Sequence, residues 1–232
     1  MERLGTNYGG WIVPDDMKLD VVYSGGVGED ISFDIKLQTK YDCDIILIDP
    51  TTKAVKHFEE CQKYFSDKSF KFTGGIQYDY YTSIENEQPN LDKFSYIQKG
   101  LWDQKDNLKF FRQDNENYVS QSLIDGMFSK NYDIVEVDTI KNLMEMNGHD
   151  HIDLLKLDIE GAEIKVINKM LDDGIFPKYL CIEFDLYLKQ KDHDNSTQVL
   201  IERLQKIGYV IIANENMNVT FSLQINRSKM KC

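Results

Sequence analysis

Two carboxylates follow an apolar run in the second half of the sequence. The run 154–157 contains a single lysine and is followed by Asp158, Glu160 and a glycine. This pattern is typical of a buried strand in a parallel sheet, and open α/β sheets bind ligands at the carboxyl ends of such strands. A carboxylate there can act as a general base toward a substrate hydroxyl, or orient it for attack. In the competing interpretation, Glu160 and Glu163 cap the following helix and Asp158 binds loop amides.

A second pair of acids follows the apolar run 179–182. Glu183 and Asp185 stand at its end, so Glu183 is expected beside the same cleft if the two runs are neighbouring strands. Asp158 and Glu160 are the first candidates for the catalytic base or positioning group, and Glu183 is the next. The alternative role for Glu183 is hydrogen bonding beneath the sheet edge.

A glycine-rich turn follows an apolar run near the start of the chain. Its candidate cofactor-binding residues are Ser24, Gly26 and Gly28. The two glycines permit close approach of a ligand to the backbone and positive φ. Both dinucleotides and S-adenosylmethionine bind at such turns. Glu29 and Asp30 would repel a pyrophosphate at the next helix start, and isoleucine replaces the third glycine of the dinucleotide fingerprint. These residues favour S-adenosylmethionine, which has no phosphate, although both acids can also complement the helix dipole.

Two further positions suit contacts with a nucleoside. Asp49 ends the apolar run 45–48, about 20 residues after the glycines, where a carboxylate can accept both ribose hydroxyls. It would also disfavour a 2′-phosphate. Trp102 and Asp103 follow the next predicted strand, where a ring and a carboxylate can flank adenine and accept its amino proton. The alternative is a core tryptophan with a solvated aspartate.

Short apolar runs alternate with amphipathic segments, which predicts a mostly parallel sheet with intervening helices. Strands are expected at 19–24, 44–49, 94–99, 152–158, 179–184, 209–213 and 219–225, and helices at 30–40, 53–65, 139–146, 162–171 and 196–207. The last two strands are expected to form an antiparallel hairpin at the sheet edge. Asn195 or Ser196 is expected to cap the last helix, and Gly208 to end it. The chain is thus predicted to be one α/β domain spanning 1–232.

Two regions depart from this alternation. Residues 66–93 are rich in Tyr, Asn, Asp and Gly, and residues 104–138 contain the apolar fragments 108–111 and 134–137. The second region is expected to form a small β insertion over the carboxyl edge of the sheet, where substrate contacts are common.

Composition narrows the class of protein. With 27 basic and 39 acidic residues, the chain has a net charge of −12 and no long basic run, so nucleic acid is not the expected partner. No apolar stretch approaches the roughly 20 residues that span a bilayer, and the N-terminus lacks a signal-peptide core, so a cytoplasmic protein is expected. The four cysteines form no CxxC pair and are expected to be buried thiols. His149 and His151 lack a third ligand, and although carboxylates could hold a metal, no set of ligands stands out, so no metal site is predicted.

Together these segments resemble the FkbM-type family of S-adenosylmethionine-dependent methyltransferases. The resemblance lies in residues 23–34, 48–51, 100–102, 119–122, 148–163 and 182–184, most specifically in 156–163. It implies a class I methyltransferase, Rossmann-like fold: a seven-stranded mixed sheet with helices on both faces. It places Gly26 and Gly28 at the methionine part of the cofactor, Asp49 at the ribose, and Trp102 and Asp103 near the adenine.

The resemblance also implies an activity and a partner. O-methylation of a hydroxyl on a sugar, glycan or secondary metabolite is expected, with a small-molecule or glycan acceptor. Residues 9–11 also resemble the family, so 1–18 is expected to fold over the cofactor as a partial lid; the alternative is a turn with Trp11 in the core. The chain departs from the family in its extra glycine at the turn and in lacking a histidine after Phe184.

Two other functions remain open from the sequence. One is a nucleotide-dependent oxidoreductase that uses NAD at the same turn and Asp49, although Glu29, Asp30 and the missing third glycine disfavour it. The other is a cofactor-binding module without catalysis, although the acids at 158, 160 and 183 disfavour that. No heptad pattern or apolar stripe indicates an oligomeric state.

Overall fold

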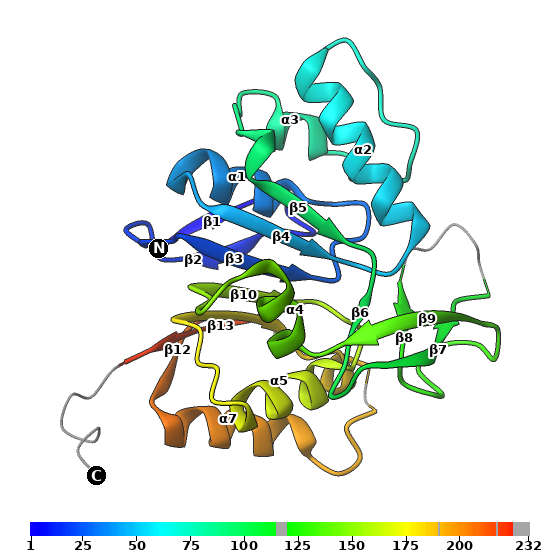
Figure 1. Ribbon diagram of the computed structural model, residues 1–232, viewed down its shortest axis with the longest axis vertical. Helices are drawn as coiled ribbons and strands as arrows, with labels where there is room; N and C mark the ends of the chain where they lie inside the picture. Colours follow the sequence, from blue (N-terminus) through cyan, green and yellow to red (C-terminus); the bar gives the residue numbers. More distant parts are fainter. Residues whose placement is uncertain (115–119, 190, 217, 225–232) are drawn as a thin grey trace.

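A seven-stranded mixed sheet forms the centre of the computed structural model, which describes residues 1–114, 120–189, 191–216 and 218–224 (Figure 1). Its strands are β3 (Val21–Gly25), β4 (Asp44–Ile48), β5 (Phe94–Ile97), β10 (Leu154–Leu157), β11 (Tyr179–Glu183), β12 (Tyr209–Glu215) and β13 (Asn218–Leu223). They lie in the order β12-β13-β11-β10-β3-β4-β5, and β13 runs opposite to the other six strands. The predicted seven-stranded fold and edge hairpin are confirmed; residue 225 of the last predicted strand lies outside the described residues.

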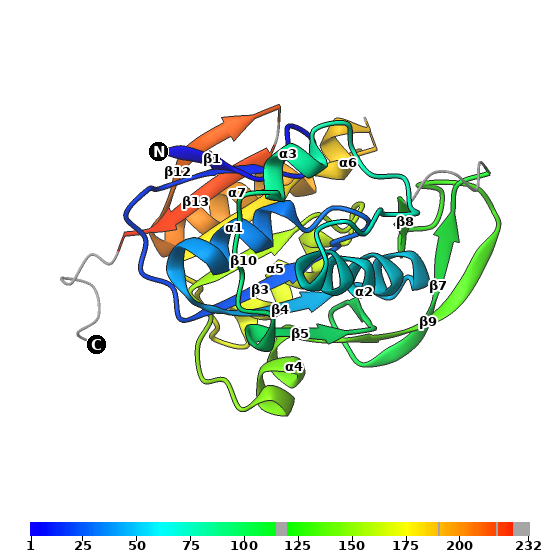
Figure 2. The same ribbon diagram turned by 90° about the horizontal axis from the view of Figure 1, so that it is seen from above.

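Helices cover both faces of this sheet (Figures 1 and 2). Successive residues of a strand point to opposite faces, and here the residues on each face are apolar, so both faces are buried. In β3, Val22 packs with one core cluster and Tyr23 with the other. The first cluster lies under α1 (Ser32–Tyr41), α2 (Thr52–Ser66) and α3 (Tyr80–Ile84), and the second under α4 (Ile140–Asn147), α5 (Glu163–Asp172) and α7 (Ser196–Ile207). Two short elements, η1 (Leu91–Lys93) and α6 (Asp185–Leu188), complete the described helices.

Helix ends follow the local sequence in most places. Thr51 caps α2 by accepting a hydrogen bond from Ala54 N at 3.2 Å, and Gly208 ends α7 with φ of 123°. Asn195, one of the two predicted caps, occupies the N-cap position of α7, but it is left-handed and its side chain makes no capping hydrogen bond. Asp192 Oδ2 accepts instead from Thr197 N at 3.1 Å.

The order of the strands creates a crevice at one end of the sheet. From β3 the chain adds β4 and β5 on one side, and later adds β10 and β11 on the other. Loops leaving β3 and β10 therefore diverge, which is the topological switch point at which open α/β sheets bind ligands.

Two smaller β elements flank the central sheet. The second sheet contains β6 (Gly100–Leu101), β7 (Asp106–Arg112), β8 (Gln121–Ser122) and β9 (Tyr132–Asp138), in the order β6-β9-β7-β8, and extends beside the end of β5 (Figure 1). It contains both predicted apolar fragments of the insertion; residues 115–119 lie outside the described range. At the N-terminus, β1 (Glu2–Leu4) pairs with β2 (Trp11–Val13), and Thr220 of β13 donates to Ile12 O at 2.8 Å.

The remaining sequence expectations concern single residue types. Cys43, Cys61 and Cys181 are buried free thiols, as predicted, and Cys232 lies outside the described residues. His149 lies 3.0 Å from the Tyr23 hydroxyl, and His151 pairs with Asp150 at 2.7 Å. In the part of the chain that the structure describes, no helix has the length and apolar character needed to cross a bilayer.

Candidate functional site

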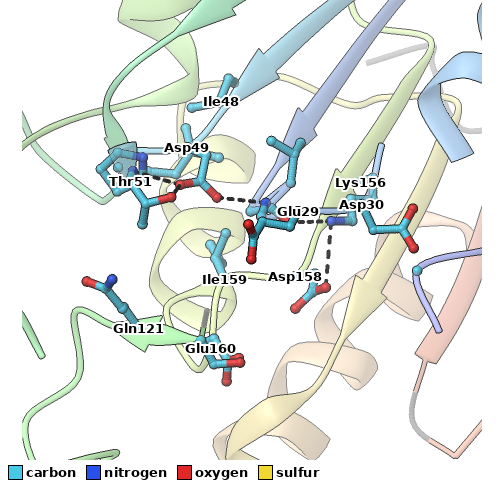
Figure 3. A pocket seen from close by; sticks show the side chains of 18 of the residues that line it. Glu29, Asp30, Ile48, Asp49, Thr51, Gln121, Lys156, Asp158, Ile159 and Glu160 are labelled. Carbon is cyan, nitrogen blue, oxygen red and sulfur yellow. Dashed lines mark hydrogen bonds and ion pairs between the residues drawn. The ribbon is translucent and has the colours of Figure 1, made fainter. Parts of the chain in front are cut away.

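An open cleft of about 950 Å³, counting the space at its mouth, lies over the switch point (Figure 3). Its floor is the glycine turn after β3, and its walls come from the loops after β4 and β10. The small sheet supplies Phe110 and Gln121 on one side, and the N-terminal hairpin supplies Tyr8 and Gly9 on the other. Segments far apart in sequence therefore line one space.

The glycine turn is held tightly between the two neighbouring loops. Gly26 has φ of 72°, and a Cβ there would lie 1.7 Å from the carbonyl oxygen of Asp158. Gly28 has φ of 51° and donates its N–H to Asp49 Oδ2 at 3.0 Å. Both positions require glycine or strongly favour it, because side chains rarely adopt this conformation and at Gly26 no space exists for one.

Asp49 is buried at the end of β4 and is largely used by its own loop. Its Oδ1 accepts from Thr51 N at 2.8 Å and from Thr51 Oγ1 at 2.6 Å, while Oδ2 accepts from Gly28 N. Burial raises the pKa of Asp49. A carboxylate has about four acceptor positions, so one remains, on Oδ2. Asp49 thus has capacity for one ligand hydroxyl, where the sequence suggested two.

Three of the candidate cofactor-binding residues do not line the cleft. Ser24 is completely buried beneath the turn. Trp102 lies under the Lys165 ammonium, which is 4.9 Å from its ring, and Asp103 lies 3.7 Å from the same lysine. Because neighbouring strand residues alternate in direction, Leu101 faces the cleft and Trp102 turns away from it. The apolar walls are formed instead by Ile48, Pro50, Leu101, Phe110, Leu123 and Ile159.

Lys156 is a site residue that the sequence analysis did not single out. It lies on β10 with only 6% exposure, and its Nζ donates to Gly26 O at 2.6 Å and to Gly25 O at 3.4 Å. The same nitrogen lies 3.7 Å from Asp158 Oδ2 (Figure 3). The feature of the sequence that could have identified Lys156 is its position as the single charged residue in an otherwise apolar strand.

Four acids gather at the opposite end of the cleft from Asp49; Asp158, Glu160, Glu183 and Asp185 are called the acid cluster below. Asp158 and Glu160 line the cleft, and Lys189 pairs with both Glu160 and Asp185. Glu183 lies behind Asp158 rather than on the cleft wall. The predicted acids of β10 and β11 are therefore brought together, because these two strands are parallel neighbours.

Burial and mutual repulsion keep protons in the acid cluster. Burial, and then the neighbouring Asp158 carboxylate, raise the pKa of Glu183 to about 10. Burial, with Glu160 and Asp158, raises the pKa of Asp185 to about 7. At neutral pH, Glu183 therefore carries a proton that it shares with Asp158.

Tyr8 brings a phenol to the same end of the cleft. Partial burial, followed by the charges of Asp158, Glu160 and Glu183, raises the pKa of Tyr8 to about 12, so its hydroxyl remains a donor. The loop carrying it is held by Thr6, whose Oγ1 donates to Asp30 Oδ2 at 2.5 Å. Asp30, which follows the glycine turn, thus holds the loop that carries Tyr8.

Glu163 has a supporting role in this arrangement. It is completely buried, and its two oxygens accept from Gly161 N at 2.9 Å and from Asp185 N at 3.2 Å. Burial raises its pKa to about 8. Glu163 therefore joins the ends of β10 and β11 beneath the cleft and does not reach a ligand.

Comparison with known proteins identifies the family. The family model of the methyltransferase FkbM domain matches residues 26–211 of the sequence. The chain belongs to the FkbM methyltransferase family. The matched range of this FkbM methyltransferase includes the glycine turn, Asp49, Lys156 and the acid cluster, whereas Tyr8 precedes it. No curated protein and no solved structure matches the chain.

Proposed function

We propose that this FkbM methyltransferase transfers a methyl group from S-adenosylmethionine to a hydroxyl oxygen of a small-molecule or glycan acceptor. The observation that carries the proposal is one continuous cleft that joins the glycine turn and Asp49 to the acid cluster. The first end suits a nucleoside, and the second suits cations and a hydroxyl.

The residues present fit the cofactor. The apolar walls from Ile48, Pro50, Leu101 and Ile159 are suited to an adenine ring, and the free acceptor position of Asp49 is suited to one ribose hydroxyl. The acid cluster lies where the ammonium and sulfonium charges would be favoured, and two glycines permit close approach of the backbone. When bound, S-adenosylmethionine supplies a methyl group on a positively charged sulfur, which is a good leaving group.

The protein then has two tasks: to orient the acceptor oxygen and to receive its proton. We assign both to Asp158, which faces the cleft and is restrained by the Lys156 ammonium at 3.7 Å. Glu183, protonated at neutral pH, donates to Asp158 and restrains the same carboxylate. Tyr8 covers this end of the cleft and helps to exclude water.

Ligand-dependent thermal unfolding tests the cofactor. S-adenosylhomocysteine at about a hundred times its dissociation constant should stabilise the fold by about 2.7 kcal/mol. NAD should have no effect at the same concentration. Stabilisation by NAD, together with none by S-adenosylhomocysteine, would overturn the proposal in favour of an oxidoreductase.

Incorporation of radiolabelled methyl groups into a panel of hydroxylated acceptors tests the reaction. With an active acceptor, Asp158→Asn should bind S-adenosylhomocysteine normally and lose about 10²–10⁴-fold in turnover. Asp150→Asn, an equivalent change in an exposed loop, is the matched control. Wild-type turnover in Asp158→Asn would refute the assigned role, and binding without transfer to any acceptor would point to a non-catalytic module.

A further inference from the structure

We propose that Asp158, Glu183 and Asp185 bind a divalent cation, Mg²⁺ or Mn²⁺, at the acid-cluster end of the cleft. Each residue offers one carboxylate oxygen, and these three oxygens all lie within 4.8 Å of one another. They come from the carboxyl ends of β10 and β11, which are fixed relative to each other by parallel pairing. This spacing lets one ion contact all three.

An unpaired oxygen supports the site independently of the spacing. Asp185 is only 3% exposed, and its Oδ1 pairs with Lys189. Its Oδ2 is buried and has no hydrogen-bond partner among the described residues. A buried carboxylate oxygen without a partner is costly, and a cation beside it removes that cost.

The local charge also matches a divalent ion. The acid cluster contains four carboxyl groups, and the ammonium groups of only two lysines, Lys156 and Lys189, pair with them. Full ionisation of the cluster would therefore leave two negative charges uncompensated. A divalent cation would neutralise that excess.

The donor set indicates which ions the site prefers. All three ligands are carboxylate oxygens, which suit the hard cations Mg²⁺ and Mn²⁺, and the triad has neither imidazole nor thiolate. Three protein ligands leave coordination positions open toward the cleft. If the proposed methyl transfer is correct, the acceptor hydroxyl takes one of these positions, and the second oxygen of Asp158 remains able to accept its proton.

A second group of potential ligands provides a comparison. Asp20, His151 and Asp153 also lie close enough to share an ion, but near the start of β3 and β10. There, Asp153 Oδ2 already accepts from Asp20 N at 2.6 Å and Val21 N at 3.0 Å, and His151 is exposed. No unpaired buried oxygen is found in this group among the described residues, so it serves as the control.

Electron paramagnetic resonance of free Mn²⁺, titrated with chelator-treated full-length protein and no cofactor, tests the proposal. We expect one saturable site whose dissociation constant rises at least tenfold in Asp185→Asn and in Glu183→Gln. Asp20→Asn, the same kind of change in the comparison group, should bind Mn²⁺ like the wild type. Excess Mg²⁺ should displace the bound Mn²⁺.

Absence of saturable binding, unchanged affinity in both cluster variants, or loss confined to Asp20→Asn would each overturn the cation site. Thermal unfolding without metal shows whether the variants fold. If Asp185→Asn does not fold, Glu183→Gln decides, because its side chain is partly exposed. Calorimetry with S-adenosylhomocysteine alone is the separate test of the methyltransferase proposal, so failure of either inference is recognised without the other.

Discussion

At the scale of single residues, Lys156 connects stability to the site. A lysine is rarely buried without partners, and this one donates to two carbonyls of the glycine turn and lies near Asp158. Burial raises the pKa of Asp34 to about 6, and the positive charge of Lys156 opposes that rise. The Lys156 ammonium group therefore stabilises the glycine turn, the Asp158 carboxylate after β10 and the Asp34 carboxylate on α1.

Lys156→Met should destabilise the fold by about 2–4 kcal/mol, because charged hydrogen bonds are lost and Asp34 loses its compensating charge. Urea unfolding followed by circular dichroism measures this change. Lys165→Met, which alters an exposed lysine, should stay within about 0.5 kcal/mol of the wild type. Equal stability of both variants would show that Lys156 contributes little to the turn.

At the scale of elements, the contact between α2 and α3 depends on a buried polar group. His57 of α2 hydrogen-bonds the Tyr80 hydroxyl of α3 at 2.7 Å, and Phe72 stacks on its ring. Burial lowers the pKa of His57 to about 4. The thiol of Cys61 lies 3.3 Å from the same hydroxyl, and burial raises its pKa to about 12, so it is no nucleophile at neutral pH.

This contact makes stability depend on pH. Below the ordinary histidine pKa of 6.5, the unfolded chain binds a proton that the folded protein excludes until about pH 4, so stability falls as the pH falls. Between pH 7.5 and 5.0, the wild type should lose about 2 kcal/mol more than His57→Gln. Urea unfolding at both values measures this, with exposed His193→Gln as control. Parallel losses in wild type and His57→Gln would contradict it.

At the scale of the whole molecule, the N-terminal hairpin of β1 and β2 contributes residues both to the core and to the wall of the cleft. Trp11 and Val13 are buried in the core that also contains α1 and α2, whereas Tyr8 at the hairpin tip is 63% exposed and borders the cleft. The sequence offered a lid and a core anchor as alternatives for this segment. Trp11 and Val13 lie on β2 and pack into the core, as the core-anchor alternative predicts, whereas Tyr8 lies in the turn between β1 and β2, and the lid stays a prediction.

Two substitutions should separate these contributions. Trp11→Ala should cost about 3–5 kcal/mol of stability, because a large buried ring leaves a cavity. Tyr8→Ala should change stability by less than about 0.5 kcal/mol yet raise the KM for the acceptor. Unfolding curves and steady-state methyl transfer measure the two effects. Unchanged kinetics in Tyr8→Ala would remove the tip from the acceptor site.

Local pattern was sufficient for the central sheet and its longer helices, but not for short elements such as β1, β2 and α3. The seven strands and five longer helices follow from apolar periodicity, and their bounds differ from the predicted ones by a few residues. The glycine turn, Asp49 and the acids at 158, 160 and 183 could also be named from sequence, because polar residues at the ends of buried strands meet at one sheet edge.

What sequence alone determined is therefore the set of elements in the central sheet and its longer helices, together with the end of the sheet at which the candidate site residues gather. Only the tertiary structure decided which side chains meet there. Ser24 is buried and Trp102 turns away, while Lys156 and Tyr8 reach the cleft and Asp185 completes a carboxylate triad. The physical reason is that such contacts depend on strand order, register and loop direction, which arise from packing across distant segments and have no local signal.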